Sequence, residues 1–226
     1  MELDDFAKEF SERVLATAAA DGNFSRSAFT ETALAFLEEA GQIVEYVPCY
    51  FKGTGLQRRA LEMDAYAFDD VDESLALFVA DYHNFDASER ITRSDATKLF
   101  ARMVAVLDEA MTGRLNATIE DSHPAFAFGL QLRRQFTNVT RIRLYLLTDA
   151  LMSEQIKDLP EKNLLGKPCE FNIWDMARFH RSQESPTGRD ELEVDFSSLV
   201  PGGLPCLAAS IDSPDYRAYR SIVPVY

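Results

Sequence analysis

The sequence predicts an α/β protein with a mixed central β-sheet flanked by helices. Stretches with helical hydrophobic spacing alternate with short runs rich in β-branched and aromatic residues. These elements follow the order helices, hairpin, helix, then strands alternating with helices, which is typical of a sheet covered by helices. The 226 residues, 46% of them hydrophobic, are enough to build a substantial core.

The first 41 residues are predicted to be helical. One stripe of apolar residues recurs every three or four positions, as Leu3, Phe6, Phe10 and Val14. This helix should run to about residue 20, where the sequence DGN interrupts it. Ser27 is expected to cap a second helix, AFTETALAFLEEA, which Gly41 closes.

Three strands should come next. VPCYFKGTG predicts a short strand and a glycine turn, and residues 61–68 and 75–83 predict a hairpin around an acidic loop. If the loop runs from Asp69 to Ser74, Phe68 faces Leu75 and Tyr66 faces Leu77.

A long helix should follow the hairpin. Thr92 and Asp95 resemble a capping box, a wide apolar face comes next, and Gly113 ends the helix. Ser122 and Pro124 predict the start of another helix, which reaches about residue 136.

The last part of the chain predicts strands joined by shorter elements. RIRLYLLTDA is typical of a buried strand, and EFNIWDM predicts a strand that leads into the helix MARFHRSQE. ELEVDF alternates as a strand does, PGGLP predicts a turn, and YRSIVPVY is strand-like to the last residue. Because a natural terminus rarely falls inside an apolar run, we expect a longer parent protein. Residues 1–226 are predicted to form its single N-terminal α/β domain, with a helical start at 1–41 and a sheet core over about 47–226.

The composition indicates the cellular compartment of the protein and limits the classes of partner that it can bind. The net charge is −14, so the whole surface does not suit bulk binding to nucleic acid. No apolar run approaches the roughly 20 residues that a membrane span needs. Three widely spaced cysteines, at positions 49, 169 and 206, indicate reduced thiols and therefore a cytoplasmic protein.

Two carboxylates in the hairpin are the strongest candidates for chemistry. In the expected register, Asp64 and Asp81 are diagonal neighbours, and His83 lies on their face. Asp side chains at this spacing can converge on Mg²⁺, which prefers oxygen ligands. The alternative is that both are structural carboxylates at strand ends.

This pattern resembles the PD-(D/E)xK restriction-endonuclease-like fold. The resemblance implies Asp64, Asp81 and His83 as catalytic residues, and Asp64, Asp81 and Glu38 as metal ligands. The candidate helix acids in the sequence are Glu31, Glu38 and Glu39. His83 stands where the pattern has lysine, and a neutral imidazole supplies no fixed positive charge.

A second candidate site is a basic island between residues 122 and 148, a stretch without any acid. It contains four arginines: Arg133, Arg134, Arg141 and Arg143. These side chains could contact phosphate, and such binding should weaken steeply with salt. The interpretation that we favour is a solvated face paired with nearby acids.

Several stretches in order resemble the N-terminal region of abortive infection phage resistance (AIPR) proteins of bacteria. They include MELDDFAKEFSERVLATAAADGNF, DAYAFDDVDESLALFVADY, FNIWDMARFHR and GRDELEVDFSSLVPGGLPCL. The resemblance implies a cytoplasmic phage-defence protein whose C-terminal AIPR region is missing here and is a partner within the same polypeptide. We expect the module to act by recognition or assembly. The alternative is a Mg²⁺-dependent nuclease acting on DNA or RNA, and homo-oligomerisation and nucleic-acid binding stay open.

Overall fold

The computed structural model describes residues 1–22, 25–86, 89–153, 162–184, 206–208 and 219–221. By its contacts the chain divides into two units, Met1–Arg189 and Asp190–Tyr226. In the second unit, β9 (Cys206–Ala208) pairs antiparallel with β10 (Tyr219–Ser221). The described helices and the larger sheet belong to the first unit.

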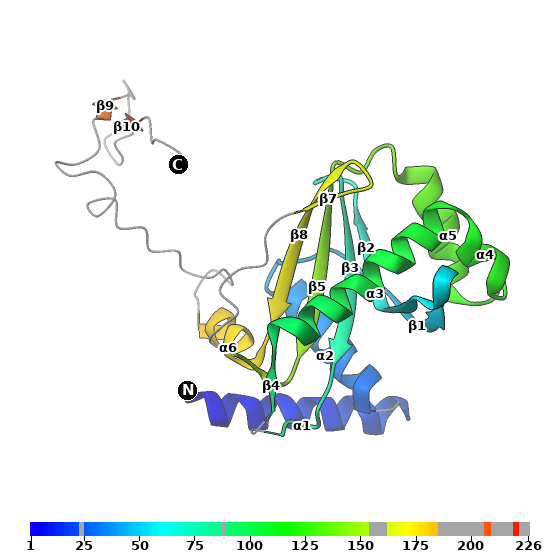
Figure 1. Ribbon diagram of the computed structural model, residues 1–226. Helices are drawn as coiled ribbons and strands as arrows, with labels where there is room; N and C mark the ends of the chain where they lie inside the picture. The colour runs from blue at the N-terminus through cyan, green and yellow to red at the C-terminus, as the bar shows by residue number, and fades with distance from the viewer. Residues whose placement is uncertain (23–24, 87–88, 154–161, 185–205, 209–218, 222–226) are drawn as a thin grey trace. The chain divides into compact units, whose positions relative to one another are not determined.

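A six-stranded mixed sheet forms the centre of this unit, in the order β1-β2-β3-β5-β8-β7 (Figure 1). Its strands are β1 (Val47–Thr54), β2 (Ala60–Asp69), β3 (Ser74–Asp81), β5 (Arg141–Thr148), β8 (Lys167–Trp174) and β7 (Lys162–Leu164). β2 is antiparallel to both β1 and β3, whereas β3, β5 and β8 are parallel to one another. The edge strand β7 is antiparallel to β8. A separate short pair joins β4 (Arg90–Ile91) to β6 (Leu151–Met152).

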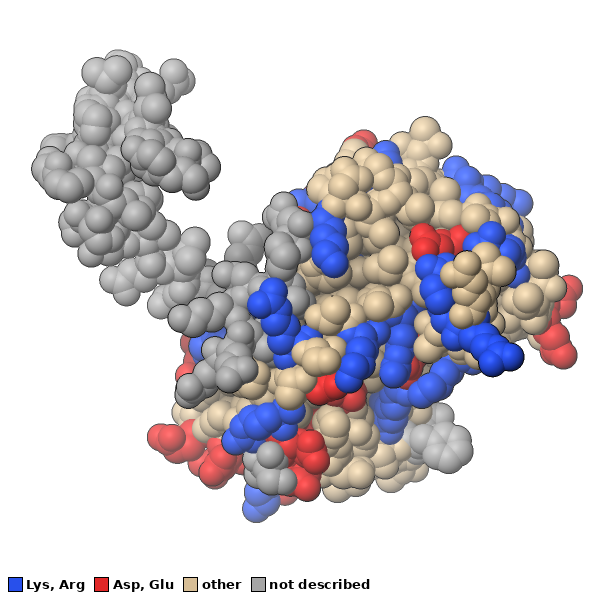
Figure 2. Space-filling view, viewed as in Figure 1, with Lys and Arg blue, Asp and Glu red and all other residues tan. Residues whose placement is uncertain are grey.

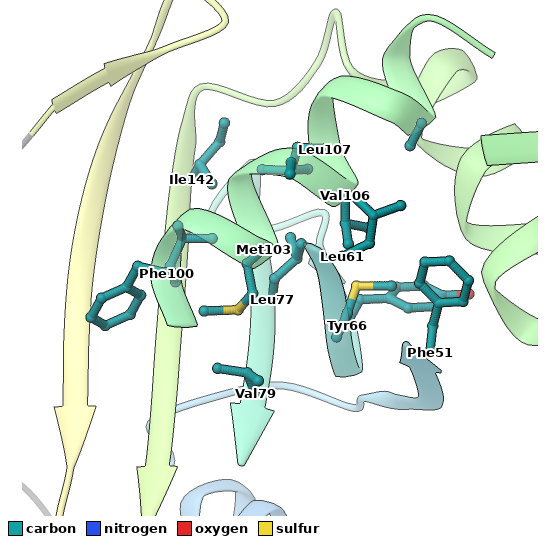
Figure 3. Close-up of a cluster of buried hydrophobic side chains, with 14 of the residues drawn as sticks. Phe51, Leu61, Tyr66, Leu77, Val79, Phe100, Met103, Val106, Leu107 and Ile142 are labelled. Carbon is teal, nitrogen blue, oxygen red and sulfur yellow. The ribbon is translucent and has the colours of Figure 1, made fainter. Parts of the chain in front are cut away.

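One face of the sheet is covered by α3 (Arg93–Met111), α4 (Arg114–Thr118) and α5 (Pro124–Gln135), and a 3-10 turn, η1 (Leu56–Arg58), joins β1 to β2. Thr92 caps α3, because its side chain accepts the backbone N–H of Asp95 at 3.2 Å, as the sequence predicts. Figure 3 shows Met103 and Leu107 of α3 above Leu77 of the sheet, within the larger apolar cluster.

The predicted start of α5 needs a correction. Its N-cap is His123 and not Ser122, since the His123 Nδ1 atom accepts the backbone N–H of Ala125 at 3.0 Å. Pro124 occupies the first turn, where its missing N–H costs nothing.

The opposite face is covered by α1 (Leu3–Asp21), α2 (Ser25–Glu39) and α6 (Met176–Glu184). The predicted stripe on α1 is confirmed: Phe6, Phe10 and Val14 are fully buried. The helix α2 already begins at Ser25, two residues before the predicted cap. With helices on both faces, β3 is buried on both sides, so its sequence is apolar without alternation.

The mixed α/β fold with a central sheet flanked by helices is therefore confirmed, and so is the hairpin register, with Phe68 opposite Leu75 and Tyr66 opposite Leu77. The predicted strand ELEVDF and the turn PGGLP lie outside the described residues. No helix in the described ranges combines the length and the apolar character needed to cross a membrane.

The packing of α3 gives a first prediction. Leu99 and Phe100 are 7% and 3% exposed, so Leu99→Ala or Phe100→Ala should each lower the free energy of unfolding by about 2–5 kcal/mol. Thr97→Ala, on the exposed side of the same helix, should change it by less than about 0.5 kcal/mol. Urea denaturation followed by circular dichroism measures the difference. Equal stabilities for all three variants would mean that α3 is not docked on the sheet.

Candidate functional site

The strands β2 and β3 separate at the end of their shared ladder. Their paired residues run from Asp69 and Ser74 to Ala65 and Phe78. One residue beyond, the Asp64 carboxylate accepts the backbone N–H of Ala80 at 2.7 Å. The pairing of β1 with β2 shifts its register at the same level, between Pro48 and Phe51. Such irregularities re-aim side chains and are common beside functional sites.

An arginine from α2 lies where β2 and β3 separate, a place that we call the fork. Because α2 begins at Ser25, Arg26 lies in its first turn. The Arg26 Nη2 atom donates to Glu62 Oε1 at 2.8 Å, to Asp64 Oδ2 at 2.8 Å and to the carbonyl oxygen of Ala80 at 3.0 Å. One guanidinium therefore joins α2 to both strands of the fork.

Two more cations complete the cluster around Glu62. Arg102 of α3 donates to Glu62 Oε2 at 2.5 Å, and the Lys52 ammonium of β1 lies 3.4 Å from Oε1. Glu62 and Asp64 are only 3% and 4% exposed. We call these five residues the fork cluster: Arg26, Lys52, Glu62, Asp64 and Arg102. Three cations against two carboxylates leave it with a net charge of +1.

The pKa values of the two acids are shifted in opposite directions. Burial raises the pKa of Asp64, and the Arg26 charge and the Ala80 N–H offset only part of that effect. Burial would also raise the pKa of Glu62, but the hydrogen bond from Arg102 and the charge of Arg26 outweigh it and lower that pKa. The fork cluster opens to the surface in a pocket of about 370 Å³, where Tyr50 donates its hydroxyl to Glu31 at 2.8 Å.

The other two predicted catalytic residues pair with each other at the end of β3. The His83 Nε2 atom lies 3.0 Å from Asp81 Oδ2. Burial lowers the pKa of His83, but the hydrogen bond and charge of Asp81 outweigh it, so the pKa is raised. Asp81 therefore stabilises the charged form of the His83 imidazole.

A buried acid that the sequence reading missed holds the turn beyond β3. Asp149 accepts the backbone N–H of His83 at 2.8 Å and that of Phe85 at 2.5 Å. This turn places Asn84 and Phe85 at φ values of 57° and 56°, which non-glycine residues rarely adopt. The available signal was an acid directly after a buried strand, in the sequence LLTDA.

The predicted metal ligands have different partners in the structure. Asp64 bonds to Arg26 and to the backbone of Ala80, whereas Asp81 bonds to His83. Glu38 is exposed and lies twelve residues beyond Arg26 on α2, about 18 Å along the helix axis. Within the described residues, no group of three or more His, Cys, Asp or Glu side chains is placed to hold a metal ion.

The four predicted phosphate-binding arginines lie in three environments. Arg141 and Arg143 both form ion pairs with Asp72. Arg133 donates to the carbonyl oxygen of Ala110 and to the Asn116 side chain, so it caps the end of α3. Arg134 is exposed on α5. Nucleic-acid contact by these residues stays a prediction.

Comparison with known proteins gives one match. Residues 29–181 match the family model described as the abortive infection phage resistance protein N-terminal domain. The matched range begins within α2 and extends into α6, so it contains the whole six-stranded sheet. No curated protein and no solved structure matches the sequence significantly.

Proposed function

The chain belongs to the abortive infection phage resistance protein N-terminal domain family, and from this we infer that it is the N-terminal module of a phage-defence protein that acts by recognition or assembly. We place this module in the bacterial cytoplasm, with the C-terminal region of a longer parent polypeptide as its first partner. The observation that carries the choice of mechanism is the position of Arg26. Its guanidinium is bound to Asp64, one of the two carboxylates that a nuclease would use, and to the neighbouring Glu62.

A metal ion at this fork would compete with Arg26. Mg²⁺ needs near-octahedral oxygen ligands at about 2.0–2.1 Å and carries two positive charges. The Arg26 nitrogen already lies 2.8 Å from both Glu62 and Asp64. Binding the ion there would displace the Arg26 guanidinium. The ion would also be repelled by Lys52 and Arg102, which remain beside Glu62.

Two observations support the alternative, a Mg²⁺-dependent nuclease of the restriction-endonuclease-like type. The Asp64 carboxylate contacts the backbone of Ala80, directly before Asp81, so the two acids come from neighbouring strands at one end of the sheet. The order of α2, the β2–β3 hairpin, α3 and the parallel strand β5 also suits that fold. This function would need Arg26 to withdraw and His83 to act in place of lysine.

A metal titration separates the two functions. We expect the melting temperature of the chain to stay unchanged within error on addition of Mg²⁺ or Mn²⁺, since a ligand that binds the native state must raise it. No cleavage of single- or double-stranded DNA or RNA should accompany either metal. A metal-dependent rise that Asp81→Asn abolishes would establish the nuclease site instead.

A phage-plating assay with the full-length parent tests the same choice in cells. Asp81 is about a quarter exposed, so Asp81→Asn should fold normally. A recognition or assembly module should then protect cells as well as the wild type does. Loss of protection by Asp81→Asn, with unchanged protein abundance and melting temperature, would contradict the proposal.

A further inference from the structure

A groove on the α3 face of the sheet has a composition unlike the rest of this acidic protein. It lies between α3 and the β7–β8 edge and has a volume of about 480 Å³. One stripe of α3 forms one wall, through Arg93, Thr97, Phe100, Ala101 and Val104. Strands β7 and β8 form the other wall, through Lys162, Asn163, Leu164, Cys169 and Phe171. Arg59 completes the lining, and we call this feature the α3–β8 groove.

The floor of the groove is apolar and partly aromatic. The rings of Phe100 and Phe171 meet edge to face, with their centroids 5.0 Å apart. Phe100 is buried, whereas Phe171, Val104 and Leu164 are only partly buried beside the core cluster. Apolar surface is therefore left beside a fixed aromatic pair, which is the usual lining of a small-molecule site.

The rim of the groove carries positive charge. Its described lining residues include three cations and no carboxylate, in a chain with a net charge of −14. Arg59 is engaged with Asp108 at 3.0 Å and Glu109 at 3.7 Å. Neither Arg93 nor Lys162 forms an ion pair with another residue that the structure describes. Figure 2 shows lysine and arginine side chains spread across the middle of this face with a few acidic residues among them, and a larger group of acidic residues near α1.

Two of these cations lie at opposite walls of the groove. Arg93 is an exposed residue of the first turn of α3, and Lys162 is the exposed first residue of β7. The Lys162 ammonium lies 5.8 Å from the centre of the Phe171 ring. A charged group held near this ring would be next to the apolar floor.

We propose that the α3–β8 groove binds a small organic anion with an apolar, ring-bearing body. The body packs against Phe100, Val104 and Phe171, and the carboxylate, sulfonate or phosphate head binds Arg93 and Lys162. The volume is within the roughly 300–1,000 Å³ typical of ligand pockets. Nothing in this assignment depends on the fork cluster, because the two sets of lining residues have no member in common.

The charge requirement is tested with a pair of fluorescent probes. 8-Anilinonaphthalene-1-sulfonate is an aromatic anion, and N-phenyl-1-naphthylamine has the same rings without the sulfonate. We expect the folded chain to bind the sulfonate at least about tenfold more tightly, since hydrogen bonds to charged groups are among the strongest. Equal affinities would show that the rim cations do not hold a head group.

A set of variants locates the site. Arg93→Glu and Lys162→Glu should each weaken sulfonate binding and together should weaken it at least about tenfold, whereas Arg134→Glu, the same single reversal on the exposed side of α5, should leave it unchanged. Ala101→Trp fills the groove from an exposed position of α3 and should weaken both probes without lowering the melting temperature.

The opposite pattern would overturn the proposal. If Arg134→Glu weakens sulfonate binding as much as Arg93→Glu or Lys162→Glu alone does, the probe responds to net charge and not to the groove. If Ala101→Trp leaves both affinities unchanged in a normally folded protein, the probes bind elsewhere. Competition by duplex DNA but not by small aromatic anions would assign this rim to nucleic acid instead.

Discussion

Arg26→Ala lowers the free energy of unfolding by about 2–4 kcal/mol, because it leaves two buried carboxylates without their shared cation. Removing one partner of a buried ion pair costs about 3–5 kcal/mol. The expected loss is smaller here, because the Arg26 side chain is 36% exposed and Glu62 keeps Arg102 and Lys52. Lys98→Ala, which breaks the exposed pair with Asp95, should cost less than about 1 kcal/mol. Urea denaturation of the two variants gives both values.

A second substitution identifies where that loss arises. Asp64 depends on Arg26 more than Glu62 does, so Arg26→Ala combined with Asp64→Asn should be more stable than Arg26→Ala alone. The two substitutions are in contact and should not be additive. If the loss of unfolding free energy in the double variant equals the sum of the two single losses, Arg26→Ala does not act by leaving the Asp64 carboxylate without a partner.

The pH dependence of the same variant has a definite sign. Burial already raises the pKa of Asp64, and the charge of Arg26 lowers it, so Arg26→Ala raises that pKa further. A carboxyl group whose pKa is higher in the folded than in the unfolded state binds more protons when folded, and stability falls as pH rises. The destabilisation by Arg26→Ala should therefore be largest near neutral pH and shrink as the solution is acidified through the folded pKa of Asp64.

Phe10→Ala should lower the free energy of unfolding by about 3–5 kcal/mol. Phe10 is fully buried, and its ring lies within 6.3 Å of five other phenylalanine rings between centroids. These rings belong to Phe6, Phe29, Phe36, Phe85 and Phe179. They come from α1, α2, α6 and the turn after β3, so the truncation opens a cavity where four segments meet.

The control for Phe10→Ala is on the same helix. Leu15 is 58% exposed, so Leu15→Ala should change stability by less than about 0.5 kcal/mol. Similar melting temperatures for both variants would mean that α1 does not pack on the sheet. If the predicted difference is found, α1 is needed for folding even though it lies before the matched range, which begins at residue 29.

Local patterns in the sequence predict the elements well, because each depends on a few neighbouring residues. The position of the acidic loop, with strands that pair evenly from its two ends, is enough to pair Phe68 with Leu75. The spacing of Phe6, Phe10 and Val14 is enough to assign the buried side of α1. Caps are less certain: Ser122 has the preferred chemistry, but the imidazole of His123 makes the bond.

The environment of the candidate acids could not be predicted in the same way. Asp64 was a recognisable candidate, but its partner Arg26 is 38 residues away and looks like an ordinary surface residue at a helix start. The register irregularity opposite Asp64 begins at Pro48 of β1, a residue type common at bulges, but no local pattern links that position to Asp64. Whether a carboxylate meets a metal or a guanidinium depends on how a helix packs against a fork between strands, and no short-range pattern specifies that.

The double-sided burial of β3 has a consequence for synthesis on the ribosome. In the sheet, β3 lies between β2 and β5. The strand β2 comes before it in the chain, but β5 is made much later, since Glu73 and Thr140, which are in contact at the start of β3 and β5, are 67 residues apart in sequence. At about 5–20 residues per second, roughly 3–13 seconds pass before β5 emerges. For that time the sequence SLALFVA presents an open hydrophobic edge, a template for pairing with other nascent chains. The acids that flank it directly, Glu73 and Asp81, are placed to act as gatekeepers against such pairing.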